Sequence, residues 1–431
     1  MIATWVVVLI LAGAADAGPP SLRAQVASLQ KQLAAALRSG DWAGFREAAQ
    51  AQRLLAPGDP AVRYNLACAE ARLGRPDAAL AELSAWAALG GSASLSDDAD
   101  LASLRANPRF VGLQRRADAN RTRISTGRET VVLADPDLLA EDLAWDPRRG
   151  SFLVSSVRHR KVVVVAADGG MTNLVHEAQD GVGSVLAIAL DPKRRLLWAA
   201  TAGLPQGLGA RPQDRDTSAL VAFDADSGAL RGRYPPPADA PAHALGDLTL
   251  GPDGTVYVSD GRAGAVYRLA PGAKGLEALV PPGGLVSPQT PVLAPEGRSL
   301  WVPDYRLGIA IVPLGGGPIG WLRGPADLAD TGIDGLTLAG GALIAVQNGS
   351  VPPRIVRLVF DLAASRIVRW EVLERGPQIG EPTHGTQVGD AFFALVESGW
   401  DRFGDDGSPK AGVEARPARI LRFDLPRPVP R

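Results

Sequence analysis

The chain has 431 residues, of which 46% are hydrophobic and 5% are aromatic, with 49 glycines and 35 prolines. That length allows about two to three domains with real cores, and so many glycines and prolines favour turns over long helices. The 45 basic and 46 acidic residues nearly cancel. This balance argues against a nucleic-acid partner, because nucleic-acid binding needs a basic field.

Residues 1–17 have the pattern of a secretory signal. An apolar run from Trp5 to Leu11 is followed by small residues that end in Ala15-Asp16-Ala17. We therefore predict cleavage after Ala17 and export to the periplasm or the exterior of a bacterium. The alternative is an uncleaved anchor helix, but the apolar run is too short to span a bilayer comfortably. We expect no membrane span after cleavage of the signal.

Residues 20–118 carry helical periodicity and predict a small all-α domain. Apolar residues recur at helical spacing up to Leu37, after which Gly40 ends one helix and Asp41 caps the next. Gly40 and Gly74 lie 34 residues apart, and a helix–turn–helix unit of that length is typical of tetratricopeptide repeats. The segment therefore resembles a pair of such repeats, which would bind a protein partner or pack against neighbouring structure.

Cys68 is the only cysteine of the chain. The sequence therefore offers no disulfide framework and no cysteine metal site. Cys68 lies on an Ala/Leu helical pattern, which predicts a buried, small apolar residue. Residues 119–129 are expected to form a linker to the next domain.

From residue 130 to residue 427 the periodicity is that of strands, and one phrase recurs: apolar strand, reverse turn, apolar strand, polar loop. Six occurrences begin at residues 141, 186, 246, 289, 334 and 384. Each interval leaves room for four strands, as in a propeller blade. We predict a mainly β chain, with a six-bladed β-propeller after a small all-α tetratricopeptide-like domain. Residues 129–135 can pair with 418–425 in the last blade and close the ring.

In a propeller the first strand of each blade lines the central channel, and its first residue faces one mouth. The predicted inner ring at that mouth is Glu141, Leu186, Gly246, Gln289, Asp334 and His384. The loops after each second strand return to the same mouth. We expect a small-molecule ligand to bind there, contacted by Asp247, Arg262, Tyr305 and Asn348.

Three phrases resemble the gluconolactonase/regucalcin (senescence marker protein) family of six-bladed propellers: EDLAWDP from residue 141, GDLTLGPDGTVYVSD from residue 246 and GIDGLTLAGGALIAV from residue 332. The resemblance covers residues 130–427. It implies one divalent cation, most often calcium, in the channel, and hydrolysis of lactones or related esters.

The family's metal ligands are a Glu that begins blade one, an Asn that begins a middle blade and an Asp that begins blade five. The resemblance implies Glu141, Gln289 and Asp334 in these positions. Gln289 replaces the usual Asn, and Gly246 replaces a further Asn of the family, although Asp247 follows at once.

The chemistry of these residue types fits a hard cation, which takes about six to eight oxygen ligands. Glu141, Asp334, Gln289 and Asp247 would supply about half, leaving positions for water and substrate. Such an open site can polarise a carbonyl group or activate water. Asp334 is then a catalytic candidate as base, and His384 as general acid or base, because imidazole titrates near neutral pH.

Each of these residues also has a plain structural interpretation. The acids can be solvated turn residues before strands, Gln289 a satisfied loop amide, and His384 a hydrogen-bonded loop histidine. His243 lies in a Pro/Ala-rich loop and is expected to be a surface residue. Residues 401–407 (DRFGDDG) are interpreted as a polar lid near the mouth.

Two other functions stay open. One is a non-enzymatic module in which the propeller and the helical repeats bind proteins or ligands, since fold alone does not imply catalysis. The other is a synthase-like or sugar-binding propeller without a metal.

Overall fold

The structure, a computed structural model, describes residues 20–211, 213–214 and 217–426. The predicted signal, residues 1–17, lies outside the described residues. Within those residues, no helix combines the length and the apolar character needed to cross a membrane.

The described chain begins with a helical segment. Its α-helices are α1 (Leu22–Ser39), α2 (Trp42–Leu55), α3 (Pro60–Arg72), α4 (Pro76–Ala88) and α5 (Pro108–Asn120). The short 3-10 helices η1 (Leu95–Asp97) and η2 (Ala99–Leu104) lie between α4 and α5. Consecutive helices from α1 to α4 contact one another.

The predicted helix boundaries around the two spaced glycines are confirmed. Gly40 and Gly74 follow α1 and α3, each with φ +69°, a left-handed conformation that glycine adopts without steric cost. Asp41 caps α2, because its Oδ1 accepts a hydrogen bond from the backbone N–H of Gly44 at 2.9 Å. Whether these helices are tetratricopeptide repeats stays a prediction.

The rest of the described chain forms six antiparallel sheets. Blade one is built from β3 (Ala140–Asp146), β4 (Ser151–Ser156), β5 (Lys161–Val165) and β6 (Met171–Val175). After η3 (Gln179–Gly181), blade two is built from β7 (Ser184–Asp191), β8 (Leu196–Ala202), β9 (Ser218–Asp224) and β10 (Leu230–Tyr234). Blade three is built from β11 (Leu245–Leu250), β12 (Val256–Asp260), β13 (Ala265–Leu269) and β14 (Glu277–Val280).

The remaining blades follow the same plan. Blade four is built from β15 (Val292–Leu293), β16 (Ser299–Asp304), β17 (Gly308–Pro313) and β18 (Gly320–Trp321). Blade five is built from β19 (Leu336–Ala339), β20 (Ala342–Gln347), β21 (Arg354–Asp361) and β22 (Arg366–Arg375), with β1 (Ile124–Ser125) at its edge. After η5 (Pro377–Ile379), blade six is built from β23 (Gly385–Val388), β24 (Ala391–Val396) and β25 (Arg419–Asp424), with β2 (Arg128–Val132) outermost.

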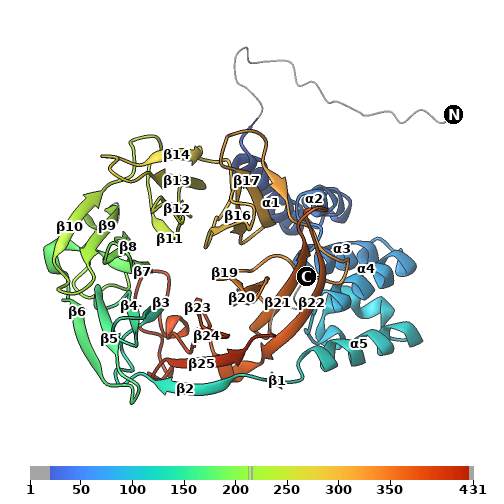
Figure 1. Cartoon of the computed structure of the whole chain (residues 1–431). Coiled ribbons are helices and arrows are strands. Elements are labelled where there is room, and N and C mark those ends of the chain that lie inside the picture. The colour runs from blue at the N-terminus through green and yellow to red at the C-terminus, as the bar shows by residue number, and fades with distance from the viewer. Residues whose placement is uncertain (1–19, 212, 215–216, 427–431) are drawn as a thin grey trace, which may run out of the picture.

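The six-bladed propeller predicted from the sequence is therefore confirmed. The first strand of each blade contacts the first strand of the next blade around the ring, so these strands surround the axis (Figure 1). Six clusters of buried apolar side chains fill the interfaces between neighbouring blades. Because alternate residues of a strand face opposite sides, each middle strand packs against both neighbouring blades.

The ring closes by joining the two ends of the propeller in one sheet. The strand β2 pairs antiparallel with β25, with Arg128 opposite Arg422 and Val132 opposite Arg419. The hydroxyl of Thr130 also donates to the carbonyl of Ile420 at 3.0 Å. The predicted closure is confirmed, and both β1 and the start of β2 lie inside the expected linker 119–129.

The helical segment packs along one side of the ring, beside β17, β21 and β22 (Figure 1). Val26 of α1 and Ala56 after α2 bury Leu307 of the β16–β17 turn. A hydrogen bond also joins the helices to the propeller: Nη2 of Arg323 donates to the carbonyl of Leu55 at 3.0 Å. Helices and propeller therefore share a buried interface.

Candidate functional site

Four ionisable side chains meet at the channel end of the inner strands, and we call them the axial cluster: Glu141, Asp247, Asp334 and His384. They come from blades one, three, five and six. One carboxylate oxygen of Glu141, one of Asp334 and one ring nitrogen of His384 all lie within 4.8 Å of one another. The predicted inner-ring positions Glu141, Asp334 and His384 are thus brought together.

Register irregularities in the inner strands shape this cluster. In β3 the pairing with β4 shifts between Ala140 and Leu143, and in β11 the pairing with β12 shifts between Leu245 and Leu248. A β-bulge redirects the side chains beside it. Glu141 and Asp247 both lie inside such shifts, so Asp247 reaches the axis although Gly246 holds the aligned position.

His384 links three blades through both ring nitrogens. Its Nε2 lies 2.5 Å from Oδ1 of Asp247, and its Nδ1 lies 2.9 Å from the backbone carbonyl of Glu141. Burial alone would lower the pKa of His384, but the negative charges of Asp142 and Asp247 outweigh it and hold that pKa well above its usual value. Both ring nitrogens thus face oxygen atoms, an arrangement that favours the protonated imidazolium.

Two carboxyl groups of the cluster, those of Asp334 and Glu141, hold their protons more tightly than usual. Burial raises the pKa of Asp334 to about 7, with Asp247 adding to the rise and His384 opposing it. Burial and then the charge of Asp334 raise the pKa of Glu141 well above its usual range. Buried Asp142 next to Glu141 has a pKa of about 6 for the same reason of desolvation. The site is rich in acidic groups.

Neutral donors hold Asp334 in place. Nδ2 of Asn348 donates to Oδ2 of Asp334 at 2.6 Å, and the hydroxyl of Tyr305 donates to Oδ1 of Asn348 at 3.0 Å. Both residues were predicted to line the mouth, and the structure places them in a chain of hydrogen bonds that ends on Asp334. All three side chains are partly exposed, whereas Glu141 and His384 are buried.

Two predicted residues lie apart from this arrangement. The amide nitrogen of Gln289 donates to the carbonyl and the hydroxyl of Ser287 at 3.3 and 3.1 Å, and among the described residues no hydrogen bond joins Gln289 to the axial cluster. Arg262 is exposed, and its backbone carbonyl accepts a hydrogen bond from Arg23 of α1. Their metal and substrate roles stay predictions.

Sequence reasoning missed two neighbours of the cluster. The indole Nε1 of Trp400, in η6 (Trp400–Arg402), donates to Oε2 of Glu141. The hydroxyl of Thr290 lies 3.2 Å from Oδ1 of Asp247 and 3.1 Å from the carbonyl of Asp334. The signal for Thr290 was its place directly after Gln289, which matches the place of Asp247 directly after Gly246.

The prediction that His243 is a surface residue is wrong. His243 is 9% exposed, and its Nδ1 lies 2.7 Å from Oδ2 of the buried Asp260. Asp260 also accepts backbone hydrogen bonds from Ala244 and Ala263. A Pro/Ala-rich loop cannot satisfy a buried carboxylate by itself, and the histidine supplies the remaining donor.

The segment interpreted as a lid lies over blades six, one and two. Phe403 is buried against Leu139 and Val157 of the blade-one region, and the side-chain amide of Gln206 in blade two donates to the carbonyl of Gly404 at 3.0 Å. Through Trp400 this segment also contacts Glu141. Its place beside the axial cluster agrees with the predicted lid. The segment is less polar than predicted, because Trp400 and Phe403 pack against apolar residues.

A cavity of about 550 Å³ follows the axis between the inner strands. Asp142, Thr290 and His384 line one end, and both apolar and polar residues, such as Leu190 and Thr386, line the rest. The axial cluster thus separates this channel from the end of the propeller that carries Trp400 and Asn348.

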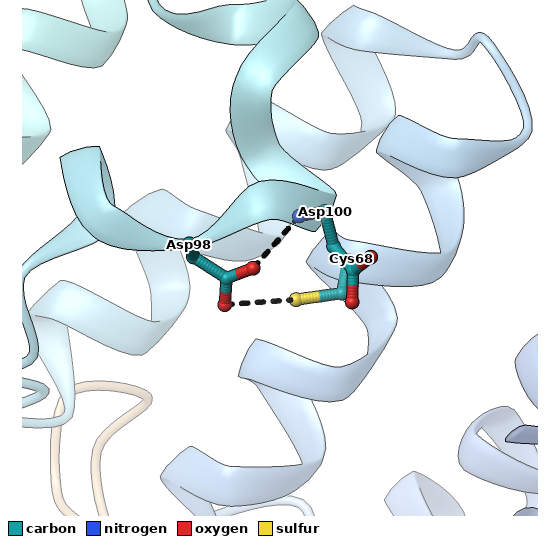
Figure 2. A group of neighbouring side chains, drawn as sticks. All are labelled: Cys68, Asp98 and Asp100. Atoms are coloured by element: carbon teal, nitrogen blue, oxygen red, sulfur yellow. Dashed lines mark hydrogen bonds between the residues drawn. The ribbon is translucent and has the colours of Figure 1, made fainter.

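A second group of possible metal ligands, Cys68, Asp98 and Asp100, lies in the helical segment (Figure 2). The carboxylate oxygens of Asp98 already have other partners. One caps η2 by accepting a hydrogen bond from the N–H of Asp100 at 2.8 Å, and the other accepts a hydrogen bond from the hydroxyl of Tyr64 at 2.6 Å. Burial, followed by the charge of Asp98, raises the pKa of Cys68 to about 12. Because metal binding needs the thiolate, we interpret this group as structural. Cys68 is buried, as predicted.

The sequence matches no protein-family profile and no curated protein. Similar solved structures include a pyrroloquinoline-quinone-bound aldose sugar dehydrogenase from Streptomyces coelicolor, with 18% identity and a TM-score of 0.48 over 70% of this chain and 99% of that one.

Two further similar structures come from the proteins named in the sequence resemblance. A gluconolactonase from Xanthomonas campestris has 16% identity and a TM-score of 0.46 over 72% of this chain and 93% of that one. A calcium-binding regucalcin from Agrobacterium tumefaciens has 16% identity and a TM-score of 0.47 over 70% of this chain and 100% of that one. These likenesses concern the propeller fold, and the functional argument below depends on the site.

Proposed function

We propose that the axial cluster binds a divalent cation and that the chain hydrolyses lactones or related esters at the mouth beside Asp334. The observation that carries the proposal is the convergence of one carboxylate oxygen of Glu141 and one of Asp334 within 4.8 Å on the propeller axis, beside a ring nitrogen of His384. Side chains from three blades meet there, and local turn structure does not require them to do so.

The donor set fits a hard cation in part. Glu141 and Asp334 offer carboxylate oxygens, which calcium and related ions prefer, and burial has raised the pKa of both groups. A cation between them would offset that cost of desolvation. Glu141 and Asp334 would therefore hold the ion, whose chemistry would be to polarise the ester carbonyl.

Within this proposal, the chain's own residues accept a proton and hold the reacting groups in position. Asp334 is partly exposed, so in its carboxylate form it can accept a proton from an attacking water. Asn348 and Tyr305 fix the orientation of that carboxylate through their two hydrogen bonds. The acid–base role predicted for His384 stays a prediction, because both of its nitrogens are engaged; within this proposal it positions Glu141 and Asp247.

The test combines binding and activity in the full chain. Calcium or manganese is titrated calorimetrically, with Trp400 fluorescence as a second readout because its indole contacts Glu141. A panel of lactones and esters is then assayed with and without the ion. Asp334→Asn is expected to weaken cation binding and to lower kcat/KM by about a hundredfold or more.

The matched control is Asp361→Asn, an exposed carboxylate at the end of β21 in the same blade. It makes the same change of charge and should leave both readouts unchanged. Absence of cation binding at millimolar concentration, together with no hydrolysis across the panel, would overturn the proposal.

One observation favours a second function, that of a non-enzymatic ligand-binding module. The His384 imidazolium already supplies a positive charge inside the cluster and contacts Asp247 directly. A ligand could then bind without any metal. Ligand binding that persists unchanged after chelation, with no turnover, would select this function.

We also infer export of the chain, from the signal pattern in residues 1–17. Fractionation of the producing cells, with mass spectrometry of the new N-terminus, tests this inference. A cytoplasmic chain that retains Met1 would contradict it. A protein partner for the helical segment likewise stays a prediction, tested by cross-linking in the exported fraction.

A further inference from the structure

A cavity of about 850 Å³ lies between the helical segment and blade five, away from the axial cluster. From the helices it is lined by residues near the start of α3 and the end of α4, including Asp59, Tyr64 and Trp86. From the propeller it is lined by the loop 349–352 and by Arg354 and Arg375. Its volume lies in the range of small-molecule sites. We call it the inter-domain cavity.

Two arginines face each other in the wall of this cavity. Arg354 on β21 and Arg375 on β22 are direct cross-strand partners, so their side chains leave the same face of the sheet. Like charges placed directly opposite each other destabilise a sheet. Arg354 also lies over the Trp370 ring, 5.5 Å from its centroid, and a negative group close to both arginines would offset their repulsion.

No carboxylate in the described part of the chain provides that compensation. Arg354 is 3% exposed, and its donors reach only neutral acceptors: Nε lies 2.7 Å from Oε1 of Gln347, and Nη2 lies 3.5 Å from the carbonyl of Ala329. Its Nη1 lies beside Gly90 at the end of α4 and has no hydrogen-bond partner among the described residues.

Arg375 is partly exposed, so it is the more accessible member of the pair. Its Nε donates to the carbonyl of Thr122 at 3.0 Å, and no described carboxylate forms an ion pair with it. Burial, followed by the charge of Arg375, lowers the pKa of Arg354 to about 10. Both guanidinium groups are still charged at neutral pH, and burying the charge of Arg354 without a counter-ion is costly.

The other charged residues of the lining already have partners within the protein. Arg121 forms an ion pair with Asp118. Asp59 caps α3 by accepting the N–H of Ala61 at 2.8 Å, and burial raises its pKa. The excess charge of the cavity is therefore positive, and it belongs to Arg354 and Arg375.

The rest of the lining is largely apolar. Trp86 and Leu89 lie on the helical side, and Val351 and Pro352 lie on the propeller side. Val351 is 78% exposed and belongs to the lining of the cavity. A ligand with an apolar body would cover it.

We propose that the inter-domain cavity binds a small organic carboxylate with an apolar or aromatic body, whose carboxylate lies between Arg354 and Arg375. A guanidinium pair suits a carboxylate because each group offers parallel N–H donors. The loop that carries Val351 also carries Asn348, which contacts Asp334. The cavity is nevertheless a separate site, and its occupancy does not require the axial cluster to bind a metal.

The experiment uses the full chain and 2-naphthoate as the probe, with 2-naphthamide as its neutral counterpart. Binding is measured by calorimetry at low ionic strength. Naphthoate is expected to bind, and naphthamide to bind at least about tenfold more weakly, as for loss of a charge-assisted hydrogen bond. Arg375→Gln should weaken naphthoate binding by a similar factor.

The matched control is Arg369→Gln, which removes an exposed arginine from the same strand β22 outside the cavity. It should bind naphthoate as the unmodified chain does. Since Arg354→Gln changes a buried residue, Val351→Asp serves as the second variant: it adds a carboxylate at an exposed lining position and should abolish naphthoate binding without unfolding the protein.

Three results would overturn the proposal: no naphthoate binding at millimolar concentration, equal binding of naphthamide, or unchanged affinity in both Arg375→Gln and Val351→Asp. Competition by inorganic phosphate as effective as that of naphthoate would also overturn it, because the apolar body would then contribute nothing. These outcomes are independent of cation binding by Asp334→Asn, so the two proposals fail separately.

Discussion

His384 and Asp247 are separated by 137 residues in sequence, yet Nε2 of one lies 2.5 Å from Oδ1 of the other. His384 belongs to blade six and Asp247 to blade three, which lie on opposite sides of the ring. Because the same imidazolium also contacts the backbone of Glu141, it connects blades that share no strand pairing.

Replacing Asp247 should destabilise the fold more than a typical surface change. Asp247→Asn leaves the buried imidazolium without its carboxylate, and breaking a buried pair in this way costs about 3–5 kcal/mol of unfolding free energy. Urea unfolding followed by tryptophan fluorescence measures the change. The control is Asp390→Asn, whose side chain is 74% exposed and should cost less than about 0.5 kcal/mol. Equal midpoints for the two variants would contradict the assigned role of the pair.

The stability of the metal-free protein should fall as the pH rises from about 5 to about 8. The pKa of Asp334 is raised from 3.8 to about 7 and that of Asp142 from 3.8 to about 6, so the folded state binds more protons than the unfolded state in this window. The raised pKa of His384 acts in the same direction above 6.5. Each group contributes a slope of up to about 1.4 kcal/mol per pH unit.

Thermal unfolding in the presence of a chelator measures this dependence. Asp334→Asn should flatten the curve between about pH 5 and about pH 7, because its side chain no longer titrates. Addition of the cation should raise the midpoint more at high pH than at low pH, since the ion competes with protons for the carboxylates. A midpoint that rises with pH in the chelated protein would contradict the assignment.

The closing strand β2 should be essential for the stability of the ring. Val131 is 8% exposed and packs in the cluster between blades six and one, so Val131→Asp should cost about 3 kcal/mol or more, because it buries an unpaired charge. Its neighbour Val132 is 39% exposed, and Val132→Asp on the same strand is the control. Similar losses of stability in both variants would show that β2 is not packed as described.

The repeated phrase in the sequence was enough to predict the ring and its closure. Each blade must bury two faces against its neighbours, so the same strand–turn–strand pattern has to recur, and the first and last strands must pair. The helix ends at Gly40 and Gly74 were predictable for a local reason, because a left-handed residue after a helix favours glycine.

The site was predictable only where the pattern itself places a residue at the axis. Glu141, Asp334 and His384 hold equivalent positions in their blades and do meet. Trp400 reaches Glu141 from an irregular loop, and the pairing of His243 with Asp260 depends on how a loop folds back over blade three. Such contacts depend on tertiary packing and leave no periodic trace in the sequence.

The pairing of β2 with β25 also determines when the propeller ring can close during synthesis. The residues of β2 leave the ribosome about 290 residues ahead of the β25 residues that they pair with, while the helices before them already have local partners. The propeller therefore remains an open array with two free sheet edges until its last strand is made. A chain released or truncated before Arg419 would expose the unpaired edges of both β2 and β24, and edges of that kind invite association with other chains.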